Sequence, residues 1–166
     1  MSNRQASSYM IRAYRSSDPE ATLCIFHDAV TVTASADYTS EQIAAWGSPE
    51  SRNLSEWDES LHQRNSYVAL VEEQIAGFSD VSEDGYVHMM FVSPKYTRSC
   101  VGYQLLRFLE NRARSSSAKQ LTADVSITAR ASFEAFGFHT ETAQNPVMNG
   151  VVMTNFRMVK QLEAHD

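Results

Sequence analysis

Arg98, Ser99 and Gly102 stand where a polar loop, residues 95–100, meets a helix-like segment that begins at Val101. The first N–H groups of a helix have no partner within it, and the helix dipole adds partial positive charge there. Glycine lets a ligand approach the backbone closely, while arginine and serine side chains can donate hydrogen bonds. This combination favours binding of a phosphate or pyrophosphate. The alternative is an ordinary strand-to-helix turn with an exposed arginine.

Two elements must position that loop. The apolar run Tyr86–Val92 is typical of a strand, and Pro94 ends it because proline has no N–H to donate to a neighbouring strand. Apolar residues at 101, 105, 108 and 109 define one face of a helix that extends to about Arg114. Side chains alternate along a strand. The residues expected on one face of this strand are Tyr86, His88, Met90 and Val92.

The rest of the chain alternates between strand and helix patterns. Asp18-Pro19 and the capping-box spacing of Thr39 and Gln42 predict the starts of two helices, the second ending near Trp46. Residues 48–64 predict a loop with a helical piece, and residues 128–136 a helix that Gly137 stops. The other predicted strands are 9–14, 67–71, 75–81, 121–125, 138–142 and 151–159, the last two joined through a turn at 148–150.

The order of these elements, βαα-βββ-α-β-α-ββ, sets the fold class. It predicts an α/β (α+β) architecture in which a mixed sheet has helices on its faces. The three strands between residues 67 and 92 predict an antiparallel meander. A chain of 166 residues suits a single domain, 1–166, with its core within residues 9–160.

Composition argues against several classes of partner. The 20 acidic and 14 basic residues give a net charge of −6, which disfavours nucleic acid and weakly favours a cationic acceptor such as an amine. No apolar run is long enough for a membrane span, and the N-terminus lacks a signal-peptide core, so we expect a cytoplasmic protein without a membrane partner. Cys24 and Cys100 form neither a disulfide framework nor a metal site, and no metal is expected.

The loop and the strand before it resemble the acetyl-CoA signature of the GNAT family of N-acetyltransferases. In that family a (Gln/Arg)-x-x-Gly-x-(Gly/Ala) loop follows a Val-x-Pro-like step. Phe91–Pro94 and Tyr96 match this layout, as does Val101-Gly102. Thr97 stands where Gln or Arg is usual, and Cys100 stands where the first glycine is usual.

Residues 126–138 resemble a second signature of this family, Asn-x-x-Ala-x-x-x-Tyr-x-x-x-Gly-Phe. Ala129 and the closing Gly-Phe pair match, whereas Ser126 replaces the asparagine and Phe133 replaces the tyrosine. Together with residues 37–46, this segment looks most like the YafP-type branch of the family.

The resemblance covers nearly the whole chain and implies the GNAT acyl-CoA N-acyltransferase fold. That fold has a mixed, mostly antiparallel sheet with helices on both faces and a central parallel strand pair that splays apart. Acetyl-CoA, the co-substrate, would lie in the wedge between those strands. The resemblance implies that ten residues hold acetyl-CoA: Phe91, Val92, Arg98, Ser99, Cys100, Val101, Gly102, Tyr103, Ser126 and Phe133.

The resemblance also implies direct attack of a primary amine on the thioester. Several family members carry the base on the strand before the loop, at the positions of His88 and Tyr86. Histidine suits this role because its reference pKa of about 6.5 lies near neutral pH; an amine that arrives neutral would need no base. Phe133 cannot donate the proton that the family's tyrosine gives to the leaving thiol. Tyr38, Tyr103 and water remain as alternative donors.

The N-terminal third, in which this family varies most, should bind the acceptor. Tyr38, Trp46 and Trp57 are candidate pocket walls because aromatic rings hold amines through cation–π contacts, although Trp46, at the end of an amphipathic helix, suits the core at least as well. Cys100 could be a catalytic nucleophile, since a helix N-terminus favours a thiolate. No histidine or aspartate is apparent beside it in the sequence, so we favour the interpretation that Cys100 is a small residue tolerated at this position.

Three hypotheses about function follow. The leading one is an acetyl-CoA-dependent N-acetyltransferase, a transferase of the acyltransferase class, that acts on a small-molecule or peptide amine. Like many family members, it could be a homodimer. The second is a catalytically silent acyl-CoA-binding module, which Phe133 and Cys100 motivate. The third is a domain of similar layout that binds another anion.

Overall fold

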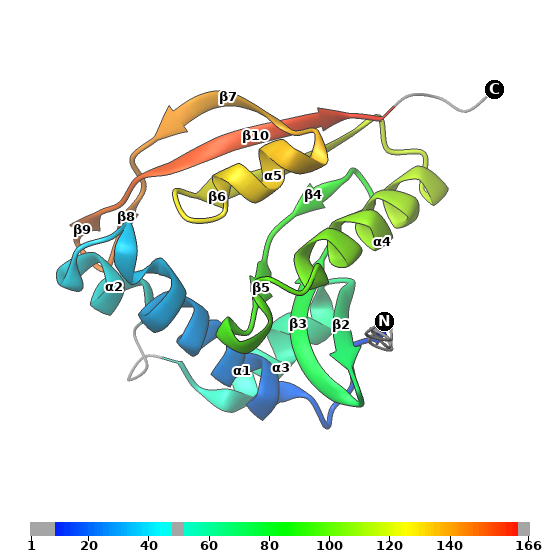
Figure 1. Cartoon of the computed structure of the whole chain (residues 1–166), viewed down its shortest axis with the longest axis horizontal. Helices are drawn as coiled ribbons and strands as arrows, with labels where there is room; N and C mark the ends of the chain where they lie inside the picture. The colour runs from blue at the N-terminus through cyan, green and yellow to red at the C-terminus, as the bar shows by residue number, and fades with distance from the viewer. Residues whose placement is uncertain (1–8, 48–51, 163–166) are drawn as a thin grey trace, which may run out of the picture.

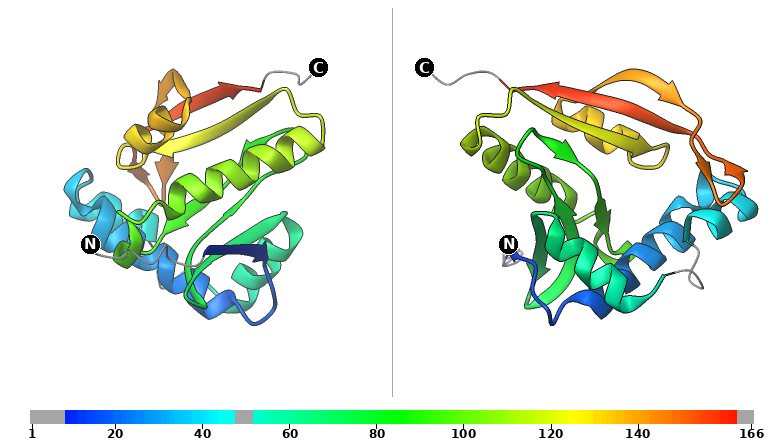
Figure 2. Two further views of the ribbon diagram at one scale, coloured as in Figure 1. Left: turned by 45° about the vertical axis from the view of Figure 1, so that its right-hand side comes forward. Right: turned by 180° about the vertical axis from the view of Figure 1, so that it is seen from behind.

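The strands form two four-stranded sheets that diverge like the walls of a wedge (Figures 1 and 2). The computed structural model describes residues 9–47 and 52–162. The N-terminal sheet has the order β1 (Tyr9–Ala13), β2 (Ser66–Val71), β3 (Gln74–Asp80) and β5 (Met90–Val92). The C-terminal sheet has the order β4 (Tyr86–Val87), β6 (Gln120–Ser126), β10 (Asn155–Gln161) and β7 (His139–Gln144). The predicted α/β class with a mixed sheet is confirmed.

The strand predicted at 86–92 is two strands, and each joins a different sheet. β4 runs parallel to β6 and pairs with it at Thr122 and Ala123. β5 instead pairs antiparallel with β3. The meander predicted for residues 67–92 therefore holds for β2, β3 and β5 only. Because the chain changes sheets between β4 and β5, the parallel pair splays apart as expected, and the wedge opens between β5 and β6 (Figure 1).

Asp80 holds the break between β4 and β5. This residue is 3 % exposed, and its two carboxylate oxygens accept the backbone N–H groups of His88 at 2.8 Å and Met89 at 3.2 Å. Arg64 Nε lies 3.4 Å from the same carboxylate. Two consecutive N–H groups therefore bond to one side chain instead of to a neighbouring strand.

The break also shifts the alternation of side chains. Met90 and Val92 pack against the cluster around Val101, whereas Tyr86 and His88 line a cavity together with Met89 and Phe91. The prediction that Tyr86, His88, Met90 and Val92 share one face is therefore wrong. Alternation requires a continuous extended strand, and Asp80 interrupts it.

The N-terminal helices begin where the sequence indicates. α1 (Pro19–Asp28) follows Asp18 and continues as π-helical and 3-10 turns through residues 29–36. α2 (Ser40–Gly47) opens with the predicted capping box, in which the Gln42 N–H donates to Thr39 Oγ1 at 3.2 Å and the Thr39 N–H to Gln42 Oε1 at 3.0 Å. α3 (Leu54–Gln63) is the predicted helical piece. Residues 48–51 of the predicted loop lie outside the described residues.

Two further helices border the wedge. α4 (Val101–Ser115) buries an apolar stripe that includes Val101, Leu105 and Leu109, and it lies along the opening of the wedge (Figure 1). α5 (Arg130–Phe136) covers β6 and ends at Gly137, whose φ of 108° is the left-handed conformation that stops a helix.

The last predicted strand is divided as well. β8 (Val147–Met148) and β9 (Val151–Val152) form a small hairpin beside α2, and its turn lies at Asn149-Gly150, as predicted. β10 then pairs antiparallel with both β6 and β7. No helix in the described residues is long and apolar enough to cross a membrane.

Candidate active site

The free edge of β5 supplies backbone groups to the wedge. The Ser93 N–H donates to the Ala76 carbonyl at 2.8 Å, and the register pairs Phe91 with Phe78. Hydrogen-bonded pairs alternate along an antiparallel ladder, so Phe91 also directs its N–H and C=O toward β3. The N–H and C=O groups of Met90 and Val92 must then point the other way, into the wedge. They are available to a ligand that lies between β5 and β6.

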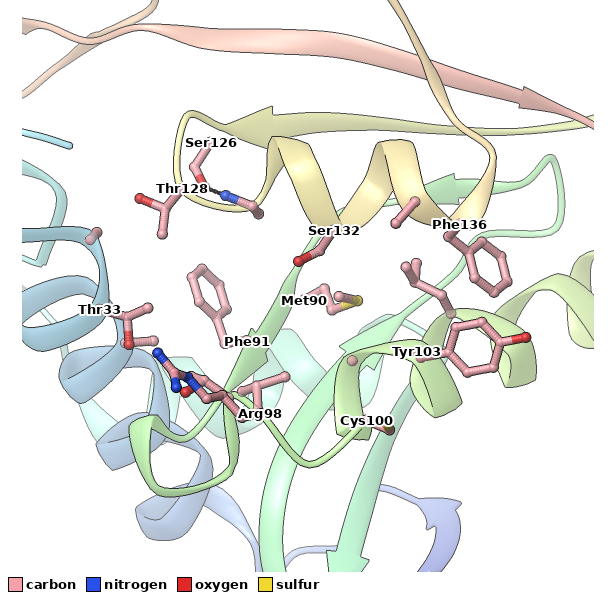
Figure 3. Close-up of a pocket in the computed structure, with 18 of the residues that line it drawn as sticks. Thr33, Met90, Phe91, Arg98, Cys100, Tyr103, Ser126, Thr128, Ser132 and Phe136 are labelled. Carbon is pink, nitrogen blue, oxygen red and sulfur yellow. Dashed lines mark hydrogen bonds between the residues drawn. The ribbon is translucent and has the colours of Figure 1, made fainter. Parts of the chain in front are cut away.

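A cavity of about 540 Å³ occupies this wedge, and we name it the wedge cleft. Its walls come from segments 29–34, 90–92, 97–106 and 126–136 and from Trp46. Figure 3 shows side chains from these segments converging on one space. The cleft is long and mostly apolar, with a helix N-terminus at its rim.

The N-terminus of α4 opens on the wedge cleft. No side chain caps this helix, and its N-cap residue, Cys100, adopts a left-handed conformation with φ 64° and ψ 13°. A Cβ at Gly102 would lie 3.5 Å from Met90 Cε, which is ordinary contact, so glycine here serves access to the backbone more than packing. Arg98 is exposed, lines the cleft and forms no ion pair with any residue in the described ranges. These groups suit a bound anion.

Seven of the ten residues predicted to hold a cofactor line the wedge cleft: Phe91, Val92, Arg98, Cys100, Gly102, Tyr103 and Ser126. The structure places the other three elsewhere. Ser99 donates its hydroxyl to the Tyr96 carbonyl at 2.7 Å. Val101 is 1 % exposed and packs between α4 and the N-terminal sheet. Phe133 is 3 % exposed, with its ring 5.0 Å from that of Phe138.

Sequence reasoning missed several residues of the wedge cleft. Ala129, Ser132 and Phe136 line it from α5, and Figure 3 shows the Ser132 hydroxyl directed into the space. Their spacing of three and four residues is the signal that could have found them, since it defines one face of a helix. Thr33 lines the cleft from the π-helical turn, and its Oγ1 is buried without a hydrogen-bond partner in the described part of the chain. No sequence pattern points to Thr33.

A second cavity, of about 660 Å³, lies next to the first, and we name it the side cavity. Trp46, Phe91 and Ser126 line both cavities, so the two meet there. The predicted catalytic residues Tyr86 and His88 both line the side cavity. A group bound in one cavity can therefore meet a group bound in the other.

Tyr86, His88 and Asp124 form one polar wall of the side cavity. The Tyr86 hydroxyl donates to Asp124 Oδ2 at 3.1 Å, and Asp124 Oδ1 also accepts from Gln144 Nε2 at 2.8 Å. Burial and the charge of Asp124 raise the pKa of Tyr86, so its phenol stays protonated. Partial burial of the ring, and then the charge of Arg64, lower the pKa of His88. His88 is therefore a neutral imidazole at neutral pH and can accept a proton.

Two of the three predicted acceptor-site aromatics reach the side cavity. Tyr38 and Trp46 line it with ring centroids 5.4 Å apart. The Tyr38 hydroxyl donates to the Thr154 carbonyl at 2.7 Å and accepts the Ile127 N–H at 2.9 Å, so its proton is already engaged. Trp57 lies outside both cavities. It is 4 % exposed, and its indole N–H donates to Thr22 Oγ1 at 3.0 Å, which makes it part of the core between α1 and α3.

No group of three or more metal-ligating side chains occurs in residues 9–47 and 52–162. The two cavities contain backbone donors, the His88 imidazole and two arginines, Arg98 near a helix end and Arg52 in the side cavity.

Comparison with known proteins identifies the fold family. The model of the acetyltransferase (GNAT) domain matches residues 34–160. The chain belongs to the GNAT acetyltransferase family. It is 38 % identical over 152 residues to the uncharacterized N-acetyltransferase YafP of Escherichia coli K12, an alignment that covers 92 % of this chain and 95 % of YafP. The predicted resemblance to the YafP-type branch is thereby confirmed.

Solved structures agree with this assignment. A GNAT protein from Rhodopseudomonas palustris superposes with a TM-score of 0.90 at 26 % identity, covering 97 % of this chain and all of that one. PaiA from Thermoplasma acidophilum, solved with coenzyme A, gives 0.73 at 18 % identity and covers 93 % and 99 % of the two chains. YncA from Salmonella typhimurium, solved with acetyl-CoA, gives 0.66 at 20 % identity and covers 96 % and 97 %. At 18 % and 20 % identity, the similarities to PaiA and YncA show a shared fold and nothing further.

Proposed function

We propose that this GNAT protein transfers the acetyl group of acetyl-CoA to the primary amine of a small molecule or peptide by direct attack. The observation that carries the proposal is the meeting of the wedge cleft and the side cavity at Trp46, Phe91 and Ser126. One cavity ends in anion-binding groups and the other holds a neutral imidazole. Such a pair can bring a thioester and an amine together without a covalent enzyme intermediate.

Residues of the wedge cleft fit the cofactor. The N–H groups at the start of α4 and the Arg98 guanidinium would hold the pyrophosphate, because both are unpaired donors with positive charge. The free N–H and C=O groups of Met90 and Val92 would pair with the amide groups of the pantetheine arm. The buried, unpartnered Thr33 Oγ1 is a further polar group that a ligand would satisfy. When bound, acetyl-CoA supplies an activated acetyl thioester.

His88 would take up the proton of the acceptor amine. Its lowered pKa keeps the imidazole unprotonated at neutral pH, and it lines the side cavity from which the amine would come. Tyr86 would remain a phenol held by Asp124 and would help to fix this wall. A backbone N–H of β5 directed into the wedge would donate to the carbonyl oxygen that gains negative charge.

The burial of Phe133 favours a second candidate, a silent acyl-CoA-binding module. The side chain at this position of the second signature has no proton to donate and packs in the core. In the catalytic alternative the leaving thiol would take its proton from Tyr103, which lines the wedge cleft, or from water.

The test combines binding with turnover. Thermal melting with and without acetyl-CoA should show a rise for the wild type, since a ligand of the folded state stabilises it by mass action, and a smaller rise for Arg98→Ala. Release of CoA thiol with a panel of amines then separates the two candidates. Binding without release for every amine would support the silent module, and no rise at millimolar acetyl-CoA would overturn both.

A further inference from the structure

The side cavity contains one charged group that the proposed acetyl transfer does not use. Arg52 lines this cavity, and its Cζ lies 4.2 Å from the ring centroid of Phe26 and 5.7 Å from that of Trp57. It is the only lysine or arginine among the residues that the structure places on the cavity wall. Its guanidinium therefore sits among aromatic rings and faces an open space.

Arg52 has no anionic partner among the residues that the structure describes. No ion pair within residues 9–47 and 52–162 includes it, its Nε is buried without a hydrogen-bond partner, and Nη2 makes one long hydrogen bond, 3.4 Å, to the Trp46 carbonyl. Burial lowers its pKa, but a guanidinium stays protonated at any working pH. An unpaired, partly desolvated cation is costly unless something satisfies it.

We propose that the acceptor is a small amine that also carries a carboxylate, and that Arg52 binds this carboxylate. This inference rests on the proposed acetyl transfer. A guanidinium stacked on a ring keeps its N–H edge free, and that edge matches the two oxygens of a carboxylate. A phosphate dianion would leave one charge without a partner, because Arg52 is the single cation on this wall.

The spacing of the rings limits the size of the acceptor. Phe26 contacts both Arg52 and a residue of the cavity junction, since its ring centroid lies 4.2 Å from Arg52 Cζ and 4.9 Å from the ring centroid of Phe91. Phe91 lines both cavities. The guanidinium carbon of Arg52 therefore lies within about 9 Å of the centre of the Phe91 ring, which limits the separation of a carboxylate on Arg52 and an amine at this junction. The acceptor class is an amino acid with a few bonds between its two groups.

Asp124 and His88 provide the complementary wall. Asp124 is the only carboxylate on the described wall of the side cavity, and it lies beside the candidate base through its contact with Tyr86. Asp124 is already paired, because Arg157 Nη1 lies 3.6 Å from its Oδ1 and Tyr86 and Gln144 donate to its carboxylate. Arg52 is therefore the charge of this cavity that a bound carboxylate would balance.

Matched acceptor pairs test this inference. Each α-, β- and γ-amino acid is assayed against its own amide, so that the amine is retained and the carboxylate is lost, with CoA release and product mass as readouts. For the best wild-type acceptor, we expect kcat/KM about 100-fold higher for the acid than for its amide. Arg52→Gln should remove this preference by raising KM for the acid, while KM for acetyl-CoA is unchanged.

Two further variants keep the test falsifiable. Arg52→Lys retains the positive charge but lacks the paired N–H groups of a guanidinium, so it should retain part of the preference for the acid. This variant serves as the test if Arg52→Gln folds poorly. Arg130→Gln is the matched control, because Arg130 also stacks at 4.2 Å over a ring, that of Phe156, but lines neither cavity; it should preserve the preference. Thermal melting with the amino acid and CoA gives a readout independent of turnover, and Arg52→Gln should lose that shift.

The outcomes separate the two proposals. Equal or better use of the amides by the wild type would overturn the carboxylate inference and leave acetyl transfer intact. The same holds if Arg52→Gln slows acids and amides equally. Acetyl-CoA binding with no turnover of any acid, amide or simple amine would overturn the proposed transfer itself, and the carboxylate inference with it.

Discussion

The wedge cleft and the side cavity are built from different kinds of groups. The wedge cleft presents backbone donors at a helix end and along a free strand edge, with glycine and small residues at its wall. The side cavity presents side chains, among them Arg52, His88 and Asp124, that come from distant parts of the chain. A backbone site tolerates substitutions such as Thr97 and Cys100, because the conformation, not the side chain, supplies the donors. A side-chain site can change its ligand with a single substitution.

The largest expected effect belongs to the side cavity. We expect His88→Gln to lower kcat by about 100-fold, because a general base contributes on that order, while acetyl-CoA binding stays unchanged. The pKa of His88 is lowered from 6.5, so wild-type kcat/KM should fall only as the pH drops below 6.5, where the imidazole becomes protonated. This fall in kcat/KM at acidic pH should be absent in His88→Gln. Unchanged kcat at saturating amine would show that the acceptor arrives neutral and needs no base.

The next effect belongs to the wedge cleft. Gly102→Glu places a side chain and a negative charge where an anion would meet the N-terminus of α4, and we expect acetyl-CoA to bind about 30-fold more weakly. Gly102→Ala is the control. Its Cβ meets only ordinary contacts, and alanine should raise helix stability by about 0.5 kcal/mol. Calorimetric titration measures both affinities, and full binding by Gly102→Glu would place the cofactor elsewhere.

Asp80 should affect both cavities, because it fixes the break between β4 and β5. In Asp80→Asn only one oxygen remains for the N–H groups of His88 and Met89, and we expect a loss of about 1–3 kcal/mol in the free energy of unfolding. Urea denaturation measures this loss. Asp84→Asn, at an exposed turn residue, should change stability by less than about 0.5 kcal/mol. Equal effects of the two variants would mean that the break does not depend on the Asp80 carboxylate.

The contrast between the cavities also explains what the sequence could predict. Thr39 and Gln42 form their capping box because both partners lie within one turn of chain, and the α4 loop is equally local. The break at residues 88–89 was missed because its cause, Asp80, acts from the neighbouring strand. Trp57 was expected at a pocket because nothing in its own segment shows that Thr22, 35 residues earlier, accepts its N–H. Tertiary contacts decide such positions.

Arg52 is a site residue that the sequence alone does not reveal. Its sequence neighbourhood is polar and carries no pattern, and its significance arises only because Phe26 and Trp57 lie beneath it in the fold. Ser132 is the intermediate case. Helical spacing from Ala129 could have placed it on the wedge cleft.

The smallest expected effect concerns the left-handed residue at the start of α4. Cys100→Gly should stabilise the fold by up to about 1 kcal/mol, since glycine adopts this conformation without the cost that a Cβ carries. Ser117, with φ 65° beyond the other end of α4, is the matched control, and Ser117→Gly should give a similar rise in melting temperature. Neither variant should weaken acetyl-CoA binding. A large loss of turnover in Cys100→Gly alone would revive the nucleophile hypothesis.

The division of the strands into two sheets has a consequence for amide hydrogen exchange. In the described residues no strand of one sheet pairs with a strand of the other, so the facing edges of β5 and β6 exchange with solvent independently. A molecule that hydrogen-bonds to both edges takes the place of a missing strand. Its binding should slow exchange at Met90 and Val92 together with exchange at the end of β6, and the two halves of the protein would then open as a single cooperative unit.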